Sequence, residues 1–242
     1  MTTGHIQFPP FSMADAAKSV EVNLISYGEH PDQVVERYGQ PRPDRPTLFL
    51  IHGGYWRDIF DREHLRPIAV ELAKLGWPIA IPEYRRIAGN PDATIEDIDN
   101  ALDVVADEAV ILIGFSTGGQ FALLRAHSHK KVEKIIGLAP VVDLISTEEL
   151  GLGRNALVEW LPAGARSRPD LDPIFMVHQS APIVIIHGLD DERVPIELSR
   201  NYTRKMQNNG FDISLIELAN TGHFELMNPS GVTFERLLKV IS

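Results

Sequence analysis

Short, almost continuously apolar runs alternate along the chain with longer segments whose apolar residues recur every three or four positions. The runs lie at 47–53, 78–85, 109–115, 132–141, 182–188 and 212–219. Runs of this length bounded by glycine or proline are typical of strands buried on both faces of a sheet. Helical spacing is clear at 61–76, 195–209 and 229–241. Together they predict a mainly parallel sheet with helices on both faces.

Three features refine this picture. Two weaker runs, 19–27 and 34–39, flank the polar turn GEHPD and predict an antiparallel pair, which brings the total to about eight strands. Thr94 with Asp97 forms a capping-box pattern and predicts the start of another helix. The segment 141–181, after the sixth strand, is too long for a plain crossover, so we expect a short helical excursion over the sheet edge. We favour a contribution to a substrate wall over the alternative that it merely shields a hydrophobic edge.

Composition narrows the function. The 242 residues are 44% hydrophobic, which suits one α/β domain over 1–242 that includes the cap-like excursion. No apolar run is long enough to span a membrane, the N-terminal residues do not form a secretory signal pattern, and cysteine is absent, so we expect a cytoplasmic protein. The net charge of -10 argues against nucleic acid or a membrane surface as partners. A homodimer is left open.

A candidate nucleophile follows the buried run at 109–115. Gly114-Phe-Ser116-Thr-Gly118 fits G-x-S-x-G, with a strand before it and a helix expected near Gly118. Small residues permit a tight turn that presents the serine hydroxyl, and the helix directs amide groups toward a developing anion. A turn serine without chemistry is the plain alternative, but the strand and the helix favour catalysis.

A serine nucleophile needs a base, and the base needs an acid. His223 lies in the polar loop NTGHFELMNP after the last strand, which suits a general base. Asp190 and Asp191 follow the penultimate strand, and we favour Asp191 because the phrase reads H-G-x-x-D-x-x-V-P. The order serine, aspartate, histidine along the chain is one in which such catalytic trios occur.

The remaining candidates surround this trio. HGGYW follows the third strand, so the amides of Gly53, Gly54 and Thr117 are candidate oxyanion donors. Aromatic residues offer a substrate pocket or ordinary core: Tyr55, Trp56, Phe115, Trp160 and Phe224. His52 and His187 at strand ends are interpreted as structural, and His127-x-His129 is insufficient for a metal site. We expect no metal and no cofactor. Arg85 and Arg86 either pair with acids or bind a carboxylate.

Residues 19–241 resemble the α/β-hydrolase fold. Within them HGGYW, Glu83-Tyr-Arg85, GFSTG and GHFE resemble the hormone-sensitive-lipase-like esterases, and HGGYW, the terminal His-Phe-Glu and YGEHPDQ are similar to kynurenine formamidases (arylformamidases). The resemblance implies Ser116 as nucleophile, Asp191 as acid and His223 as base, with Tyr55 as an additional oxyanion donor.

The expected function is therefore a serine hydrolase that cleaves a small carboxylic ester or an aryl formamide, of the N-formylkynurenine kind, through an acyl-enzyme. Two alternatives stay open: a prolyl-oligopeptidase-like peptidase, and a non-catalytic ligand-binding protein of the same fold. The peptidase is disfavoured because no accessory domain is present in the sequence. A binder has no need of an acid behind its histidine.

Overall fold

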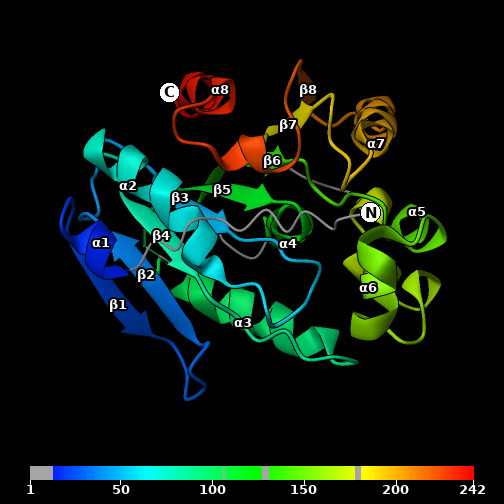
Figure 1. The fold of residues 1–242 in the computed structure, drawn as a ribbon, viewed down its shortest axis with the longest axis horizontal. Helices are drawn as coiled ribbons and strands as arrows, with labels where there is room; N and C mark the ends of the chain where they lie inside the picture. The colour runs from blue at the N-terminus through cyan, green and yellow to red at the C-terminus, as the bar shows by residue number, and fades with distance from the viewer. Residues whose placement is uncertain (1–12, 106, 127–130, 178–180) are drawn as a thin grey trace, which may run out of the picture.

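A computed structural model describes residues 13–105, 107–126, 131–177 and 181–242. At its centre lies an eight-stranded sheet with the order β1-β2-β4-β3-β5-β6-β7-β8 (Figure 1). The strands are Val22–Ser26 (β1), Val34–Tyr38 (β2), Thr47–Ile51 (β3), Ile79–Pro82 (β4), Val110–Phe115 (β5), Val132–Leu138 (β6), Ile183–Gly188 (β7) and Ile213–Leu218 (β8). The predicted number of strands is confirmed.

Pairing within the sheet follows the hydrophobic pattern. β1 is antiparallel to β2, as predicted, and β2 is also antiparallel to β4. All other neighbours are parallel. Every residue of β3 and β5 is buried, which explains why their sequences are continuously apolar rather than alternating. The carboxyl ends of β3, β5 and β7 consequently meet at one edge of the sheet, where a ligand site is expected in such folds.

Helices cover both faces of the sheet. One apolar cluster joins it to the helices Pro91–Asp103 (α3), Thr117–Arg125 (α4) and Ile196–Asn208 (α7). A second cluster joins the other face to Met13–Ala17 (α1), Arg66–Lys74 (α2) and Val232–Ile241 (α8). The fold is therefore that of the α/β-hydrolases, as the resemblance implied.

Two helices begin elsewhere than predicted. The capping box at Thr94 was wrong, because α3 already begins at Pro91 and is capped by Asn90, whose side chain accepts a hydrogen bond from Ala93 N–H at 3.4 Å. Thr94 instead donates its hydroxyl to the carbonyl of Arg85 at 2.7 Å. The last helix begins at Val232, three residues later than expected.

The segment after β6 is a chain of short helical elements, as expected. It contains Leu144–Glu149 (α5), Leu152–Trp160 (α6) and three 3₁₀ turns at Ala165–Ser167, Pro169–Leu171 and Pro173–Phe175. In Figure 1, α5 and α6 lie on the side toward which the arrow of β5 points. They therefore stand near the carboxyl ends of the strands.

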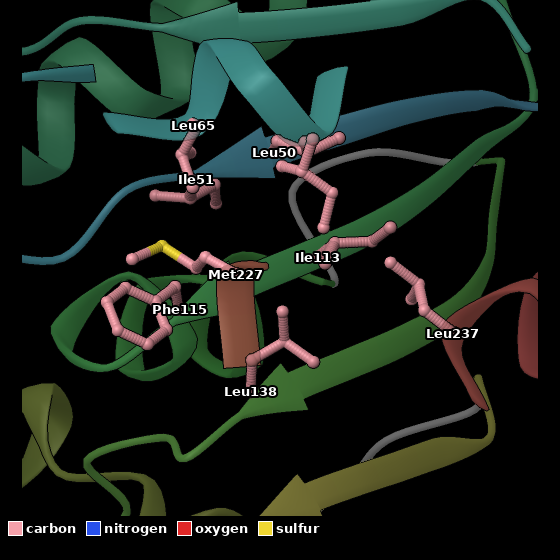
Figure 2. A pocket seen from close by; sticks show the side chains of 9 residues that line it. Leu50, Ile51, Leu65, Ile113, Phe115, Leu138, Met227 and Leu237 are labelled. Carbon is pink, nitrogen blue, oxygen red and sulfur yellow. The ribbon is translucent and has the colours of Figure 1, made fainter. Parts of the chain in front are cut away.

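A small apolar cavity lies between the sheet and the helices α2 and α8 that cover one of its faces. It measures about 10 Å³ and is surrounded by side chains such as Leu50, Ile113, Leu138 and Met227 (Figure 2). Space for one water at most, without polar side chains around it, is a packing gap rather than a ligand site. Phe115, which also lines the gap, is 4% exposed and belongs to the core.

Candidate active site

Ser116 stands on a strained turn between β5 and α4. Its φ of 56° and ψ of -121° lie in a region that residues with a side chain rarely occupy. The turn is held by the backbone: Ser116 N–H donates to the carbonyl of Leu138 at 2.9 Å, and its own carbonyl accepts from Val141 N–H at 3.0 Å. Strain kept in place by surrounding contacts is frequent at catalytic sites.

The glycines around the turn allow backbone segments to touch. A Cβ on Gly118 would lie 2.1 Å from the carbonyl oxygen of Ile51, and a Cβ on Gly114 would lie 2.3 Å from that of Gly118. A Cβ on Gly53 would lie 2.8 Å from the Cβ of Ser116. The end of β3 is thus pressed against the serine, which explains the G-x-S-x-G pattern and the glycines of HGGYW by close approach.

The candidate base and acid are joined directly. His223 Nδ1–H donates to Asp191 Oδ2 at 2.7 Å, although 32 residues separate them. Asp191 Oδ1 accepts from the N–H groups of Arg193 and Val194, both at 2.8 Å. Asp190 is exposed. The carboxylate that faces the imidazole is therefore Asp191, the one favoured from sequence.

Asp191 is held in its ionised form. Burial by itself raises the pKa of this carboxyl, but hydrogen bonds from His187 and His223 outweigh burial and bring the pKa well below its usual range. His187, expected from sequence to be structural, lies beside the acid. Its Nε2 does donate to the carbonyl of Val194 at 2.9 Å, and it also lies 3.3 Å from Asp191 Oδ2. The signal was its position four residues before the acid.

His223 lies next to the nucleophile turn. Its ring packs on the ring of Phe115, the residue before Ser116, and the two ring centroids are 4.7 Å apart. His223 and Ser116 are both nearly buried, with 6% and 2% of their surfaces exposed. The Ser116 hydroxyl forms no hydrogen bond with His223 in the described residues, and such bonds often tighten only when substrate is bound. The three sequence-predicted residues are gathered at one edge of the sheet.

Candidate oxyanion donors surround the same spot. Among the described residues, the N–H groups of Gly53, Gly54 and Thr117 form no hydrogen bond with other protein groups. Thr117 is the first residue of α4, so its N–H also lies at the positive end of the helix dipole. These amides are available to an anion, as expected.

A charged network beneath HGGYW was not anticipated from sequence. His52 Nδ1–H donates to the carbonyl of Gly53 at 2.8 Å, and its Nε2 faces Glu83 Oε1 at 3.0 Å. Glu83 also binds the Arg86 guanidinium and the N–H of Arg62. Burial favours the neutral form of Glu83, but His52 and Arg86 bring its pKa well below the usual range. The only signal in the sequence was an acid at the end of β4.

The aromatic residues proposed for the substrate pocket differ in their burial and contacts. Trp56 and Trp160 stack at 5.2 Å and belong to the core, 4% and 1% exposed. Trp56 Nε1–H donates to Gln120 at 2.9 Å. Phe224 is partly buried and packs edge-on against His223, at 5.4 Å between centroids. The hydroxyl of Tyr55 donates to the carbonyl of Arg193 at 2.7 Å, so in this conformation its proton is not available to an oxyanion.

A polar hollow of about 130 Å³ lies beside Trp56 and Trp160. Arg86, one of its lining residues, pairs with Glu83, and Arg85 pairs with Asp97 at 2.7 Å. Both arginines thus pair with acids, the first of the two roles considered. The hollow is also lined by Arg57, Asp58, Ala88, Ala156 and Glu159.

In the described part of the chain, no group of three or more histidine or acidic side chains could hold a metal ion. His127 and His129 lie outside the described residues. None of the described helices is both long and apolar enough to cross a bilayer.

Comparison with known proteins found a matching family model and several similar proteins. A family model described as BD-FAE matches residues 38–206. Esterase LipQ of Mycobacterium tuberculosis is 25% identical over 235 residues, which cover 83% of this chain and 54% of LipQ. The chain thus spans about half the length of that relative. Kynurenine formamidase of Danio rerio is 21% identical over 257 residues, covering 95% of this chain and 86% of the formamidase.

Solved structures agree on the fold. Esterase B from Lactobacillus rhamnosis superposes with a TM-score of 0.77 at 19% identity, over 93% of this chain and 84% of that chain. Thermogutta terrifontis esterase 2, phosphonylated by sarin, superposes with a TM-score of 0.71 at 18% identity, over 90% and 92%. At such identities the likeness establishes the α/β-hydrolase fold.

Proposed function

The chain belongs to the BD-FAE family, and on that premise we propose that it is a serine hydrolase that cleaves small carboxylic esters through an acyl-enzyme. The observation that carries the proposal is the 2.7 Å hydrogen bond from His223 to Asp191, formed beside the strained turn of Ser116. An imidazole oriented by a buried carboxylate next to a serine hydroxyl is the arrangement that nucleophilic acyl transfer requires.

The proposed reaction begins with proton transfer from the Ser116 hydroxyl to Nε2 of His223. The serine oxygen attacks the ester carbonyl, and Asp191 stabilises the imidazolium that forms. His223 then gives its proton to the leaving alkoxide, and the acyl group stays on Ser116. A water molecule, deprotonated by the same nitrogen, attacks the acyl-enzyme, and His223 returns the proton to the Ser116 oxygen as the acid is released. Asp191 remains ionised throughout, in keeping with its lowered pKa.

Stabilisation of the tetrahedral oxyanion is assigned to the N–H groups of Gly53, Gly54 and Thr117. Their freedom from other hydrogen bonds supports this role. Donors that are fixed before the reaction need no reorganisation as charge develops, and losing one costs about 3 kcal/mol of barrier. Close contact between Gly53 and Ser116 supports the same assignment.

Covalent labelling tests the proposal directly. A fluorophosphonate probe should label the wild-type protein at Ser116, and the Ser116→Ala variant should remain folded, unlabelled and almost inactive on p-nitrophenyl acetate. Failure of the folded wild-type protein to react would favour the non-catalytic binder. Labelling at another serine would contradict the assignment of the nucleophile.

An aryl formamide is the second candidate substrate. Two observations favour it: the similarity to the Danio rerio formamidase over nearly the whole chain, and the polar hollow flanked by stacked indoles next to HGGYW. We therefore propose to compare N-formylkynurenine with p-nitrophenyl esters of rising chain length. Preference for the formamide by kcat/KM would assign arylformamidase activity, and exclusive ester turnover would assign a general esterase. A cytoplasmic location stays a prediction.

A further inference from the structure

Tyr55 connects three parts of the molecule at the edge of the candidate site. It belongs to the turn HGGYW, and its hydroxyl reaches the carbonyl of Arg193, 138 residues away, at 2.7 Å. Arg193 is part of the loop 190–194 that carries the acid. Burial and the negative charge of Asp191 raise the pKa of Tyr55 to about 12, so the hydroxyl keeps its proton at neutral pH and can donate.

The acceptor of this bond lies next to the groups that hold the acid. Arg193 N–H and Val194 N–H both donate to Asp191 Oδ1. The peptide unit after Arg193 therefore uses its carbonyl to accept from Tyr55 and its N–H, which belongs to Val194, to bind Asp191. Any shift of that peptide moves the carboxylate that orients His223.

The backbone of Tyr55 is strained. Tyr55 and Trp56 have φ values of 51° and 58°, which cost free energy in residues with side chains. Trp56 is held by Gln120 and by stacking on Trp160. For Tyr55 the hydroxyl bond to Arg193 is the matching restraint. A strained conformation persists only when such contacts determine it.

The ring of Tyr55 also lies against α6. A Cβ on Gly153 would be 2.6 Å from the Cγ and Cδ1 atoms of the ring, so the ring rests on the glycine backbone. Gly153 itself has a φ of 62°. A side chain at this position would push Tyr55 away from α6. The helical excursion thereby helps to fix the ring.

We propose that Tyr55 is a positioning residue, which fixes the acid loop 190–194 against the oxyanion turn and so holds Asp191 and His223 in their catalytic geometry. The inference rests on the proposed function. It assigns Tyr55 neither contact with the substrate nor donation to the oxyanion. Its effect should appear in kcat, because the orientation of the base matters most in the transition state.

Tyr55→Phe removes the hydroxyl and keeps the ring. We expect kcat on p-nitrophenyl acetate to fall at least tenfold with KM changed less than threefold. The downfield proton resonance of His223 Nδ1–H, which reports on its bond to Asp191, should shift or broaden. Tyr27→Phe is the matched control, because the Tyr27 hydroxyl likewise donates to a distant carbonyl, that of Glu83, at 2.6 Å. It should lower stability without changing kcat or the resonance.

Gly153→Ala tests the same contact from the other side. It should lower kcat and disturb the resonance, whereas Gly210→Ala should do neither. Gly210 also has a positive φ, of 83°, but a Cβ there would meet nothing within 4 Å, so it controls for backbone strain alone. The double variant that combines Gly153→Ala with Tyr55→Phe should have a kcat no lower than that of the slower single variant, since both changes disturb the same placement of Tyr55.

The outcomes separate this inference from the proposed function. If Tyr55→Phe keeps the wild-type kcat and resonance and only melts earlier, Tyr55 is merely structural and the inference fails. An increase in KM alone would place Tyr55 on the substrate and overturn it as well. If the wild-type protein neither reacts with fluorophosphonate nor hydrolyses esters, the proposed function fails, while the resonance still tests the positioning of His223.

Discussion

Two carboxylate–imidazole pairs are buried on either side of the nucleophile turn. They differ in whether the second ring nitrogen of the histidine forms a hydrogen bond. Asp191 faces His223 at 2.7 Å, and Glu83 faces His52 at 3.0 Å. Both carboxyls have pKa values far below the usual range. His52 uses its other nitrogen to hold the carbonyl of Gly53. Nε2 of His223 has no hydrogen-bond partner among the described residues.

This difference separates a reactive pair from a structural one. An imidazole with an open nitrogen can take and return a proton, whereas one bonded at both nitrogens can only fix its neighbours. His52 accordingly fixes the backbone of the oxyanion turn, and His223 is left to react. Carboxylate and imidazole in contact are therefore not sufficient for catalysis. The comparison is testable by weakening one pair at a time.

Removing the open nitrogen should have the largest effect. For His223→Gln we expect kcat/KM to fall about 10⁵-fold with little change in melting temperature, because the base is lost. Ester hydrolysis and thermal unfolding measure the two quantities. His52→Gln should show the reverse. Its melting temperature should fall, and its kcat/KM should decrease by less than about 100-fold. Equal losses of activity in two equally stable variants would erase the distinction between the pairs.

Neutralising the acid of the reactive pair comes next. Asp191→Asn should lower kcat about 10⁴-fold, since an amide can hold the imidazole in the wrong tautomer and cannot stabilise the imidazolium. The exposed neighbour provides the control, and Asp190→Asn should retain nearly full activity. Full activity of Asp191→Asn with loss in Asp190→Asn would reassign the acid.

Sequence alone predicted the reactive pair better than the structural one. G-x-S-x-G, the loop histidine and the H-G-x-x-D phrase each follow a strand, and the parallel topology brings such strand ends together. Glu83 gave a weaker signal, an acid after β4 with Arg86 three residues further on, since its other partners Arg62 and His52 lie 21 and 31 residues upstream and reach it through tertiary packing. The same holds for His187, whose contact with Asp191 depends on how the loop folds back.

The strands were easier to predict from sequence than the start of α3. Continuous apolar runs located the strands, because burial on both faces leaves no other choice of residue. The start of α3 was misplaced because Thr94 and Asp97 resemble a cap but bind Arg85 across the turn instead. Sequence left Trp56 and Trp160 open as pocket or core residues, and the coordinates show that they stack in the core and also line the polar hollow.

Breaking the structural pair should affect stability most. Glu83→Gln leaves the buried charge of Arg86 without its counter-ion and His52 without its carboxylate partner, and losing one partner of a buried pair costs about 3–5 kcal/mol. We expect that decrease in the free energy of unfolding by urea titration. Glu159→Gln is the control, because Glu159 forms an exposed ion pair with Arg57 and exposed pairs contribute little to stability. A Glu83→Gln variant as stable as the control would show that the network is dispensable.

A third buried carboxyl, Asp172, extends the comparison because no cation faces it in the contacts described. Burial raises its pKa to about 6, only partly offset by backbone N–H groups that include those of Leu144 and Ile174. Asp191 and Glu83 show the opposite direction, since imidazole and guanidinium groups stabilise their charge. The three carboxyls are thus sorted by their neighbours rather than by burial.

Because its pKa is raised, Asp172 should lower the stability of the folded protein once it ionises, and the sign of this effect follows from proton linkage. The folded protein binds this proton more tightly than the unfolded chain, so the stability it contributes is full below about pH 4 and is lost as pH rises through about 6. Asp172→Asn cannot ionise, so relative to wild type it should gain about 2–3 kcal/mol between pH 4 and pH 8. Urea unfolding at both values measures this change. Asp103→Asn, at an exposed position, should show none, and an equal difference at both pH values for Asp172→Asn would mean that its carboxyl titrates normally.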